Sequence, residues 1–165
     1  SSDLVKKKIV MNKTLILLDL DHTLIYGSYA PSEEVNKLFQ FNSYLAVYER
    51  PLAKELVELC KNTGDIIIYT TALKTYATKI SKSLKIEPIQ ILSRKNCLKI
   101  KEQYRKQIDP IWIESYETII VIDDSPNVWK NTDDSIHFFV PTEFRGDAND
   151  KNLLEVIDKL NALKL

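Results

Sequence analysis

The stretch KTLILLDLDHTLI, residues 13–25, decides the fold of this chain. Its residues 14–18 are all apolar or β-branched, and such a continuous run is typical of a strand that is buried on both faces of a sheet. Two aspartates, Asp19 and Asp21, follow where the run ends. In open parallel sheets ligands bind beyond the carboxyl ends of the strands, so this stretch predicts a buried strand with a functional site at its end.

The composition indicates a globular domain without a strong overall charge. Hydrophobic residues make up 44% of the 165 residues and charged residues 28%, which excludes a disordered chain. The formal net charge is zero, so no overall field attracts nucleic acid or a membrane, and electrostatic specificity must be local. Two cysteines, Cys60 and Cys97, do not make a disulfide framework, which favours a reducing compartment.

Residues 1–12 are expected to be an N-terminal tail ahead of a single domain at 13–165. Three lysines at 6–8 precede the apolar residues 9–11, as in a signal peptide, but Asn12 and Lys13 interrupt this run too early. No apolar run approaches the length of a transmembrane helix. We therefore expect an intracellular protein of the nucleus or cytoplasm, which is neither secreted nor bound to a membrane.

Segments with strand and helix patterns alternate along the chain. Apolar runs predict strands at 14–20, 65–71, 89–92, 118–124 and 136–140. Apolar residues at helical spacing predict helices at 51–64, 73–84 and 153–160. The segment 26–49 is expected to be irregular apart from a weak strand at 44–49. The alternation predicts an α/β fold, a doubly wound, Rossmann-like parallel sheet with helices on both faces.

Polar residues end three of these strands. They are Asp19 and Asp21 for the first, Thr70 and Thr71 for the second, and Asp123 and Asp124 for the fourth. Carboxylates from neighbouring strand ends converge at one edge of the sheet. Like charges at such an edge cannot all stay ionised in a partly dry site without a cation. A hard divalent ion with oxygen ligands meets this need, so the acids predict a Mg²⁺ site.

The pentapeptide DLDHT, residues 19–23, resembles the DxDxT signature of the haloacid dehalogenase (HAD) superfamily of phosphatases and phosphotransferases. Further segments are similar to the branch that dephosphorylates the RNA polymerase II C-terminal domain, the FCP/SCP-like or NLI-interacting-factor-like phosphatases. These segments are DLDHTLI, ERPLAKEL, IIIYTTALKTYA, SRKNCLKI, YRKQI and IVIDDSPNVW. The resemblance implies a HAD-like fold and covers most of the chain from residue 14 to 129.

The resemblance also implies roles for single residues. Asp19 matches a nucleophile that forms an aspartyl-phosphate, and Asp21 matches the general acid and base. Asp19, the backbone carbonyl of Asp21, and Asp124 match ligands of Mg²⁺. Asp123 would lie beside them, as an alternative ligand or as the group that orients a lysine. The acid would need a raised pKa, which crowding and burial supply and a metal opposes.

Four further residues match groups that bind the phosphoryl group or the rest of the substrate. Thr70 matches the hydroxyl that holds a phosphoryl oxygen, and Lys106 matches the cation that neutralises the transferring group. Thr71 and Arg94 would flank the substrate. Lys99 and Lys101 lie close to Lys106 in sequence and are alternatives for the lysine.

Plainer structural interpretations stay open for the same residues. Asp19 and Asp21 could be turn residues, and Thr70 could cap the next helix. The segment 94–106 has six basic residues and one acid. It could form a positive rim for an anionic substrate, or it could be an exposed helix face that includes Lys106.

The segment 22–50 is too short for a cap domain, so only a small insertion is expected beside the site. An open site suits a phosphoserine or phosphothreonine in a phosphorylated protein or peptide, and we expect a monomer. Aromatic residues of the segment could form a wall for such a peptide or simply pack a loop; they are Tyr26, Tyr29, Phe39, Phe41 and Tyr44. The alternatives are a phosphatase for a small molecule or a nucleic-acid end, and a catalytically weak protein-binding module on the same fold.

Overall fold

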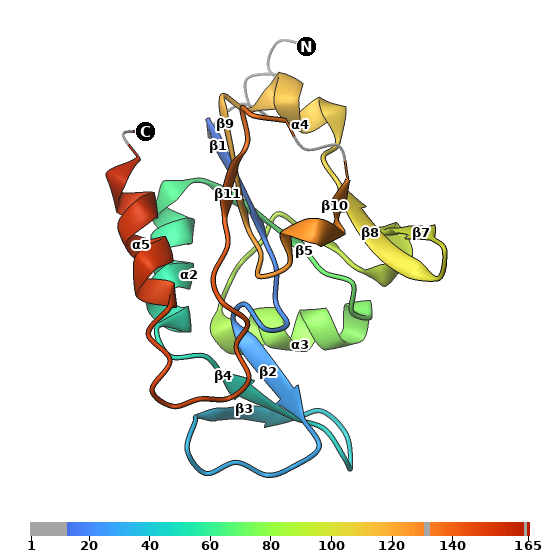
Figure 1. The fold of residues 1–165 in the computed structure, drawn as a ribbon, viewed down its shortest axis with the longest axis vertical. Coiled ribbons are helices and arrows are strands. Elements are labelled where there is room, and N and C mark those ends of the chain that lie inside the picture. Colours follow the sequence, from blue (N-terminus) through green and yellow to red (C-terminus); the bar gives the residue numbers. More distant parts are fainter. Residues whose placement is uncertain (1–12, 131–132, 164) are drawn as a thin grey trace.

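The computed structural model describes residues 13–130, 133–163 and 165, so the expected tail at 1–12 lies outside the described residues. A five-stranded sheet in the order β11-β9-β1-β5-β6 forms its centre, and all neighbouring strands are parallel (Figure 1). The strands are β1 (Thr14–Leu18), β5 (Asp65–Tyr69), β6 (Gln90–Leu92), β9 (Thr118–Ile122) and β11 (His137–Phe139). Each coincides with a predicted strand, and the doubly wound parallel sheet is confirmed.

Helices cover both faces of this sheet, as predicted. Three of them pack on the face of Ile16 and Leu18, namely α2 (Ala53–Thr63), α3 (Lys74–Leu84) and α5 (Leu153–Ala162). The short helix α4 (Pro110–Ser115) contributes Trp112 to the second core, on the face of Leu15 and Leu17. No helix in the described part of the chain is long and apolar enough to cross a membrane.

The helix α2 ends where the chain passes close to the start of β1. A Cβ atom at Gly64 would clash with the backbone oxygen of Thr14, far inside van der Waals contact. Only glycine therefore lets the chain turn from α2 directly into β5, the neighbour of β1.

The segment 26–49 is more regular than the sequence suggests. It contains most of an antiparallel sheet in the order β2-β4-β3, built from β2 (Ile25–Ser28), β3 (Lys37–Gln40) and β4 (Ala46–Glu49). The expected strand at 44–49 is confirmed as β4, but the expectation of an irregular remainder is wrong. Strands β2 and β3 have four residues each and are partly exposed, so they leave no long apolar run in the sequence. Figure 1 shows this insertion sheet beyond the carboxyl ends of β1 and β5, in the place of a cap.

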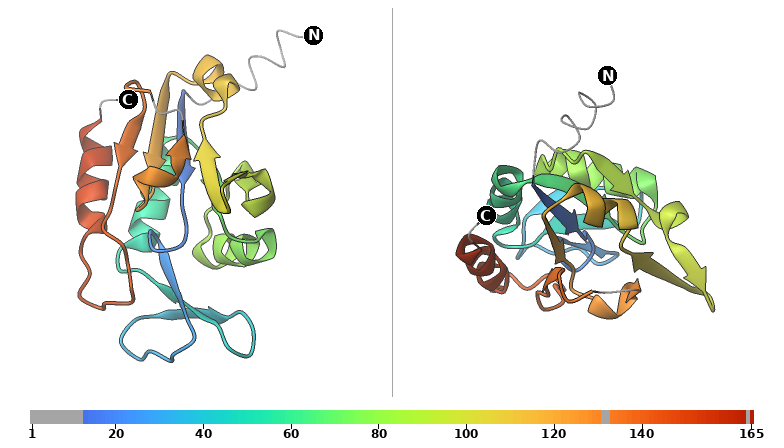
Figure 2. Two further views of the ribbon diagram at one scale, coloured as in Figure 1. Left: turned by 45° about the vertical axis from the view of Figure 1, so that its right-hand side comes forward. Right: turned by 90° about the horizontal axis from the view of Figure 1, so that it is seen from above.

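The basic segment 94–106 does not form an exposed helix face. After a single 3₁₀ turn (Arg94–Asn96) it forms an antiparallel hairpin of β7 (Leu98–Ile100) and β8 (Gln103–Gln107). Strand β8 also pairs with the short strand β10 (Trp129–Lys130). Figures 1 and 2 show the hairpin on the opposite side of the molecule from α5. The helical interpretation of Lys106 is therefore wrong, because this lysine lies in a strand.

Candidate active site

The polar residues that end β1, β5 and β9 lie side by side at one edge of the sheet. Strand β1 is in the middle, with Leu18 level with Ile68 of β5 and Ile122 of β9. The residue that follows, Asp19, donates its backbone N–H to the oxygen of Ile122 at 3.0 Å, which continues the ladder into the site. Side chains from three sequence segments therefore meet just beyond the sheet.

Lys106 occupies the centre of this group. Its Nζ lies 3.0 Å from Asp19 Oδ1 and 2.7 Å from Asp123 Oδ2, and its side chain is 2% exposed. Burial by itself lowers the pKa of Lys106, but the attraction of the two carboxylates outweighs burial and raises the pKa above its ordinary value. Lys99 and Lys101 are exposed instead. Lys106 is thus the lysine that the fold brings to the strand ends.

Both carboxylate oxygens of Asp123 accept hydrogen bonds from the protein. Oδ2 accepts from Lys106 and from Trp129 Nε1 at 2.9 Å, and Oδ1 accepts from the backbone N–H of Ser125 at 2.9 Å. Burial and the nearby Asp19 raise its pKa to about 6, against the lowering effect of Lys106. A carboxylate held this way fixes the lysine and has little capacity left for a metal ion. The geometry therefore favours the orienting role for Asp123 over the alternative of a ligand.

Thr23 joins Asp19 to the other strand-end acid, Asp124. Its hydroxyl lies 2.8 Å from Asp19 Oδ2 and 3.2 Å from Asp124 Oδ1, and it accepts the backbone N–H of Asp124 at 3.0 Å. Burial raises the pKa of Asp19 to about 6, although Lys106 opposes this, and burial also raises the pKa of Asp124. The pair therefore consists of two carboxylates that are costly to ionise in the protein alone.

These acids fit a hard metal ion. Carboxylate oxygens of Asp19, Asp123 and Asp124 lie within 4.8 Å of one another. Lys106 is a single cation beside three buried or half-buried carboxylates whose pKa values are all raised. A divalent ion would supply the missing positive charge, and oxygen ligands are those that Mg²⁺ prefers. Asp123 accepts three hydrogen bonds from the protein, against two each for Asp19 and Asp124, so Asp19 and Asp124 have more capacity to bind the ion.

Asp21 contacts α3, and Lys106 acts on it only by a small electrostatic lowering of its pKa. Its Oδ1 accepts a hydrogen bond from the hydroxyl of Tyr76 at 3.3 Å. Burial raises the pKa of Asp21, against a smaller lowering by His22. The chain reverses directly afterwards, with His22 at a φ of 65°. Asp19 and Asp21 are therefore held by different donors, which gives two carboxyl groups in one motif different environments.

Gly27 of the insertion sheet touches the same tyrosine. A Cβ atom at this position would lie 2.7 Å from the Tyr76 hydroxyl oxygen, which donates to Asp21. Any other residue would have to displace this hydroxyl, so glycine allows β2 to pack against α3 without disturbing it. The Tyr76 hydroxyl thus contacts both the insertion sheet and Asp21.

The sequence-predicted substrate residues lie beside this group. Thr70 is buried directly after β5, and its Oγ1 accepts the backbone N–H of Ala72 at 3.1 Å, which leaves its own hydrogen free to donate. The helix that follows has Leu73 as its N-cap, so Thr70 supports the turn before α3 and does not cap the helix itself. The backbone oxygen of Thr71 accepts from Arg94 Nε at 2.9 Å, and Arg94 is exposed.

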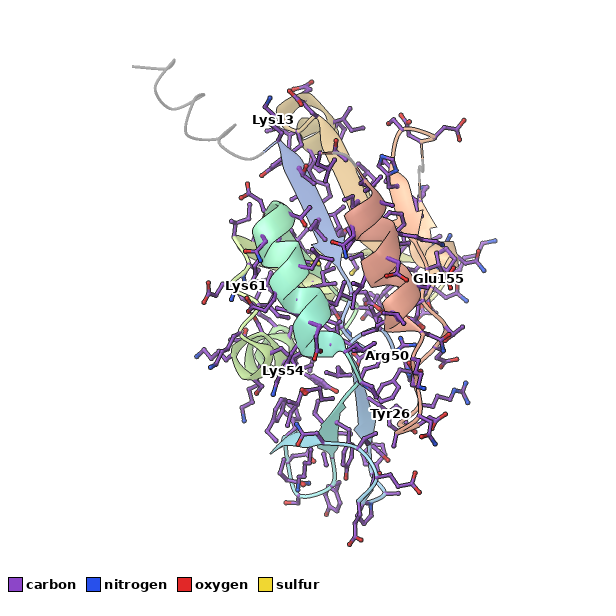
Figure 3. The ribbon with its side chains drawn as sticks, turned by 90° about the vertical axis from the view of Figure 1, so that its left-hand side faces the viewer. Lys13, Tyr26, Arg50, Lys54, Lys61 and Glu155 are labelled. Carbon is purple, nitrogen blue, oxygen red and sulfur yellow. The ribbon has the colours of Figure 1, made fainter. Side chains whose placement is uncertain are left out.

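Arg50 is a supporting residue that the sequence reasoning missed. It is fully buried and forms a two-pronged ion pair with Asp150, with Nε to Oδ1 at 2.9 Å and Nη2 to Oδ2 at 3.1 Å. Its Nη1 donates to the backbone oxygens of His22 and Thr23 at 3.2 and 3.1 Å. Figure 3 shows Arg50 between the ends of α2 and α5. Arg50 therefore ties the turn that follows Asp19 and Asp21 to the segment before α5.

Three more residues of the site were not assigned from the sequence. Thr23 is the last residue of the DxDxT motif, so the motif itself was a signal for it. Tyr76 and Trp129 lie within quoted segments of the resemblance, IIIYTTALKTYA and IVIDDSPNVW. Both are buried in the core, and each also donates a hydrogen bond to a site carboxylate.

The parallel sheet with acidic strand ends places the chain in the HAD-like class of α/β proteins. The family of NLI interacting factor-like phosphatases matches residues 13–164. The chain belongs to this family of phosphatases, which confirms the resemblance that begins at DLDHT.

Two similar proteins have related names. CTD small phosphatase-like protein 2 of Dictyostelium discoideum is 27% identical over 161 residues, which cover 92% of this chain and 27% of that protein. CTD small phosphatase-like protein 3 of Caenorhabditis elegans is 27% identical over 168 residues, which cover 96% of this chain and 57% of that protein. The chain thus spans between about a quarter and just over half of the length of these relatives.

Two solved structures share the fold. One is the fission yeast RNA polymerase II CTD phosphatase Fcp1 with an R271A substitution, bound to beryllium fluoride, with a TM-score of 0.53 and 18% identity. It matches 99% of this chain over 54% of its own. The other, Fcp1, an essential RNA polymerase II CTD phosphatase, has a TM-score of 0.53 and 20% identity, over 97% of this chain and 52% of its own. At these identities the likeness concerns the fold.

Proposed function

We propose that this chain is a Mg²⁺-dependent phosphatase that works through an aspartyl-phosphate on Asp19 and acts on phosphoserine or phosphothreonine in proteins. One observation carries the proposal. Asp19 lies at the carboxyl end of the central strand with one oxygen on Lys106 and the other on Thr23, which also contacts Asp124. A nucleophilic carboxylate, a fixed cation and a second acid for a metal ion are the groups that phosphoryl transfer requires.

In the first step an oxygen of Asp19 attacks phosphorus, and the bond from phosphorus to the serine or threonine oxygen breaks. Two negative charges of the phosphoryl group approach an anionic nucleophile, so the site must neutralise them. Lys106 remains charged because its pKa is raised, and the free hydrogen of the Thr70 hydroxyl can donate to a phosphoryl oxygen. Mg²⁺, held by Asp19, Asp124 and the backbone oxygen of Asp21, would supply further positive charge there.

Asp21 is suited to transfer the protons of both steps. Its pKa is raised by burial, so a protonated fraction can give a proton to the leaving oxygen. The resulting carboxylate then takes a proton from the water that attacks the aspartyl-phosphate, which releases phosphate and restores Asp19. Separate environments keep the roles apart, because Lys106 contacts Asp19 and Tyr76 contacts Asp21.

Substitution of Asp21 by asparagine tests this assignment. We expect hydrolysis of a phosphoserine peptide to fall by at least about a hundredfold. An activated aryl phosphate, whose leaving group needs little protonation, should instead give a burst of aryl alcohol followed by a slow steady rate. Stopped-flow absorbance measures the burst, and an Asp158→Asn variant, changed on the exposed face of α5, serves as a control with normal rates. Equal slowing of both substrates without a burst would exclude Asp21 as the acid and base.

Removal of the metal tests the second part of the proposal. We expect EDTA to abolish hydrolysis and Mg²⁺ to restore it, because three carboxylates with raised pKa values face one lysine. Mg²⁺ should also raise the Tm of the protein. An Asp124→Asn variant should need about tenfold more Mg²⁺ to reach half of the full activity or half of the full rise in Tm. An Asp133→Asn variant, changed at an exposed acid, should behave as the unmodified protein does. Activity that is indifferent to chelation would contradict metal dependence.

The substrate class rests on the insertion sheet and on the names of the relatives. The insertion from β2 to β4 is too small to enclose a metabolite, so the site stays open to a flexible peptide. Relatives named CTD small phosphatase-like support a protein substrate. The basic segment 94–106 is the observation that favours a second candidate, a phosphorylated nucleic-acid end. A panel of phosphoserine peptides, 5′-phosphorylated oligonucleotides and sugar phosphates, compared by kcat/KM, separates these substrates.

A further inference from the structure

A hollow of about 410 Å³ opens beside the site between the hairpin β7–β8 and the turn after Asp124, and we call it the arginine hollow. The residues that line it include Thr71, Arg94, Tyr104, Arg105 and Asn127. Three sequence neighbours connect it to the site: Thr71 follows Thr70, Arg105 precedes Lys106, and Asn127 follows the turn that begins at Asp124. The arginine hollow is thus a distinct surface that adjoins the strand ends.

Its two arginines lack acidic partners, and Arg94 is held in place by other contacts. Arg94 donates from Nε to the backbone oxygen of Thr71 at 2.9 Å, and its guanidinium lies 5.2 Å from the centre of the Tyr104 ring. Neither Arg94 nor Arg105 forms an ion pair within the described part of the chain. The one acid of the basic segment, Glu102, pairs with Lys99 at 3.4 Å. The positive charge of the hollow therefore stays uncompensated.

Arg105 provides an independent sign of a missing ligand. Its Nε is the one buried side-chain nitrogen or oxygen without a hydrogen-bond partner among the residues that the structure describes. Buried donors nearly always have an acceptor, and an unsatisfied one costs free energy. The guanidinium group matches two oxygens of a carboxylate or phosphate at once. Arg105 lines the hollow and the protein leaves its guanidinium group incompletely bonded, so that group is the one that an anion in the hollow would bind.

We propose that the arginine hollow binds a second anionic group of a peptide substrate, a carboxylate or a further phosphate close to the phosphoserine or phosphothreonine that is hydrolysed. Successive side chains of a strand point to opposite faces, so Arg105 points away from the carboxylates that Lys106 contacts. Arg105 therefore selects a neighbouring group and takes no part in the chemistry at phosphorus. Thr71, Arg105 and Asn127 each lie within three residues of a site residue, so we take that group to lie within about three residues of the phosphorylated one, at roughly 3.3 Å per residue of extended peptide.

This inference rests on the proposed function, and paired substrates test it. We compare a phosphoserine peptide that has alanine two or three residues to either side with the same peptide carrying glutamate or a second phosphoserine there. The unmodified protein should favour the acidic peptide by about tenfold in kcat/KM, as expected for one hydrogen-bonded charge pair. Arg105→Gln should bring this ratio close to one, and Arg105→Lys, which keeps the charge but not the fork, should restore only part of it.

A matched control separates the hollow from overall charge. Lys95→Gln removes the same charge from the same segment at an exposed residue outside the hollow, so it should leave the ratio unchanged. If Lys95→Gln lowers the ratio of the two kcat/KM values as much as Arg105→Gln does, the proposal is overturned, since net charge then explains the preference. A ratio near one in the unmodified protein would overturn it as well.

Binding distinguishes a failure of this inference from a failure of the proposed function. Fluorescence anisotropy with labelled peptides measures affinity for the Asp19→Asn protein, in which no turnover is needed. If the protein hydrolyses no phosphomonoester, the proposed function fails. The inference about the hollow is still supported if the acidic peptide binds about tenfold more tightly than the alanine peptide and Arg105→Gln removes this difference. If a 5′-phosphorylated oligonucleotide binds more tightly than either peptide and loses this advantage in Arg105→Gln, the hollow serves nucleic acid and the peptide proposal is overturned.

Discussion

An Asp19→Asn variant is expected to lose at least about a thousandfold of the phosphatase activity while it keeps its fold. Asparagine preserves the shape of the side chain but cannot attack phosphorus as a carboxylate. Its amide can still accept from Lys106 through oxygen and donate toward Thr23, so the neighbours of Asp19 keep their hydrogen bonds. Lys106 also retains its 2.7 Å contact with Asp123, which holds the lysine in position.

Two measurements check this result. Steady-state hydrolysis of an aryl phosphate gives the loss of activity, with Asp158→Asn on the surface of α5 as the control. Beryllium fluoride, which mimics an acyl phosphate, should bind the unmodified protein in the presence of Mg²⁺ and should not bind the Asp19→Asn variant. Full activity of the variant, with unchanged Tm, would exclude Asp19 as the nucleophile.

Replacing Arg50 by methionine is expected to destabilise the protein by about 3–5 kcal/mol, because the change leaves Asp150 as a buried charge without its partner. The backbone oxygens of His22 and Thr23 lose their donor at the same time. For a domain of this size the loss corresponds to a fall in Tm of about 10 °C. Chemical denaturation and calorimetry measure the two quantities.

A double substitution separates the ion pair from the loss of packing. Arg50→Met combined with Asp150→Asn removes the stranded charge, so it should be less destabilising than the sum of the single changes. Arg145→Met is the matched control, since Arg145 pairs with Glu143 on the surface and its removal should shift the Tm by no more than about 2 °C. Destabilisation by Arg50→Met of less than about 1 kcal/mol would show that the buried pair does not hold the turn.

The sequence allows the central sheet to be predicted because its strands are buried on both faces. Residues 14–18 of β1 are all buried, and such a strand has to be apolar at every position. Strands β2 and β3 are short and partly exposed, so their side chains follow no simple pattern and the sequence alone does not reveal them. The acidic strand ends could also be predicted from the sequence, because an aspartate directly after a continuous apolar run marks the end of a buried strand.

The supporting contacts could not be predicted because they join distant parts of the chain. The ion pair of Arg50 and Asp150 spans 100 residues, and no local pattern links the two. Lys106 is one of six basic residues in its segment, and its burial depends on Trp129 and Asp123, which come from other elements. Resemblance to a family identified the lysine, whereas a run of basic residues by itself is more often an exposed face.

The contact between Gly27 and Tyr76 limits how this protein can diversify. Tips of the insertion, at residues 29–36 and 42–44, can vary or be exchanged by loop grafting to alter peptide preference, because they lie outside the strands and outside Phe41, which packs on Tyr76 of α3. Position 27 has less freedom, since a Cβ atom there would lie 2.7 Å from the Tyr76 hydroxyl and would displace the group that donates to Asp21. Laboratory evolution of new substrate preference is thus best directed at the loop tips with the glycine held constant.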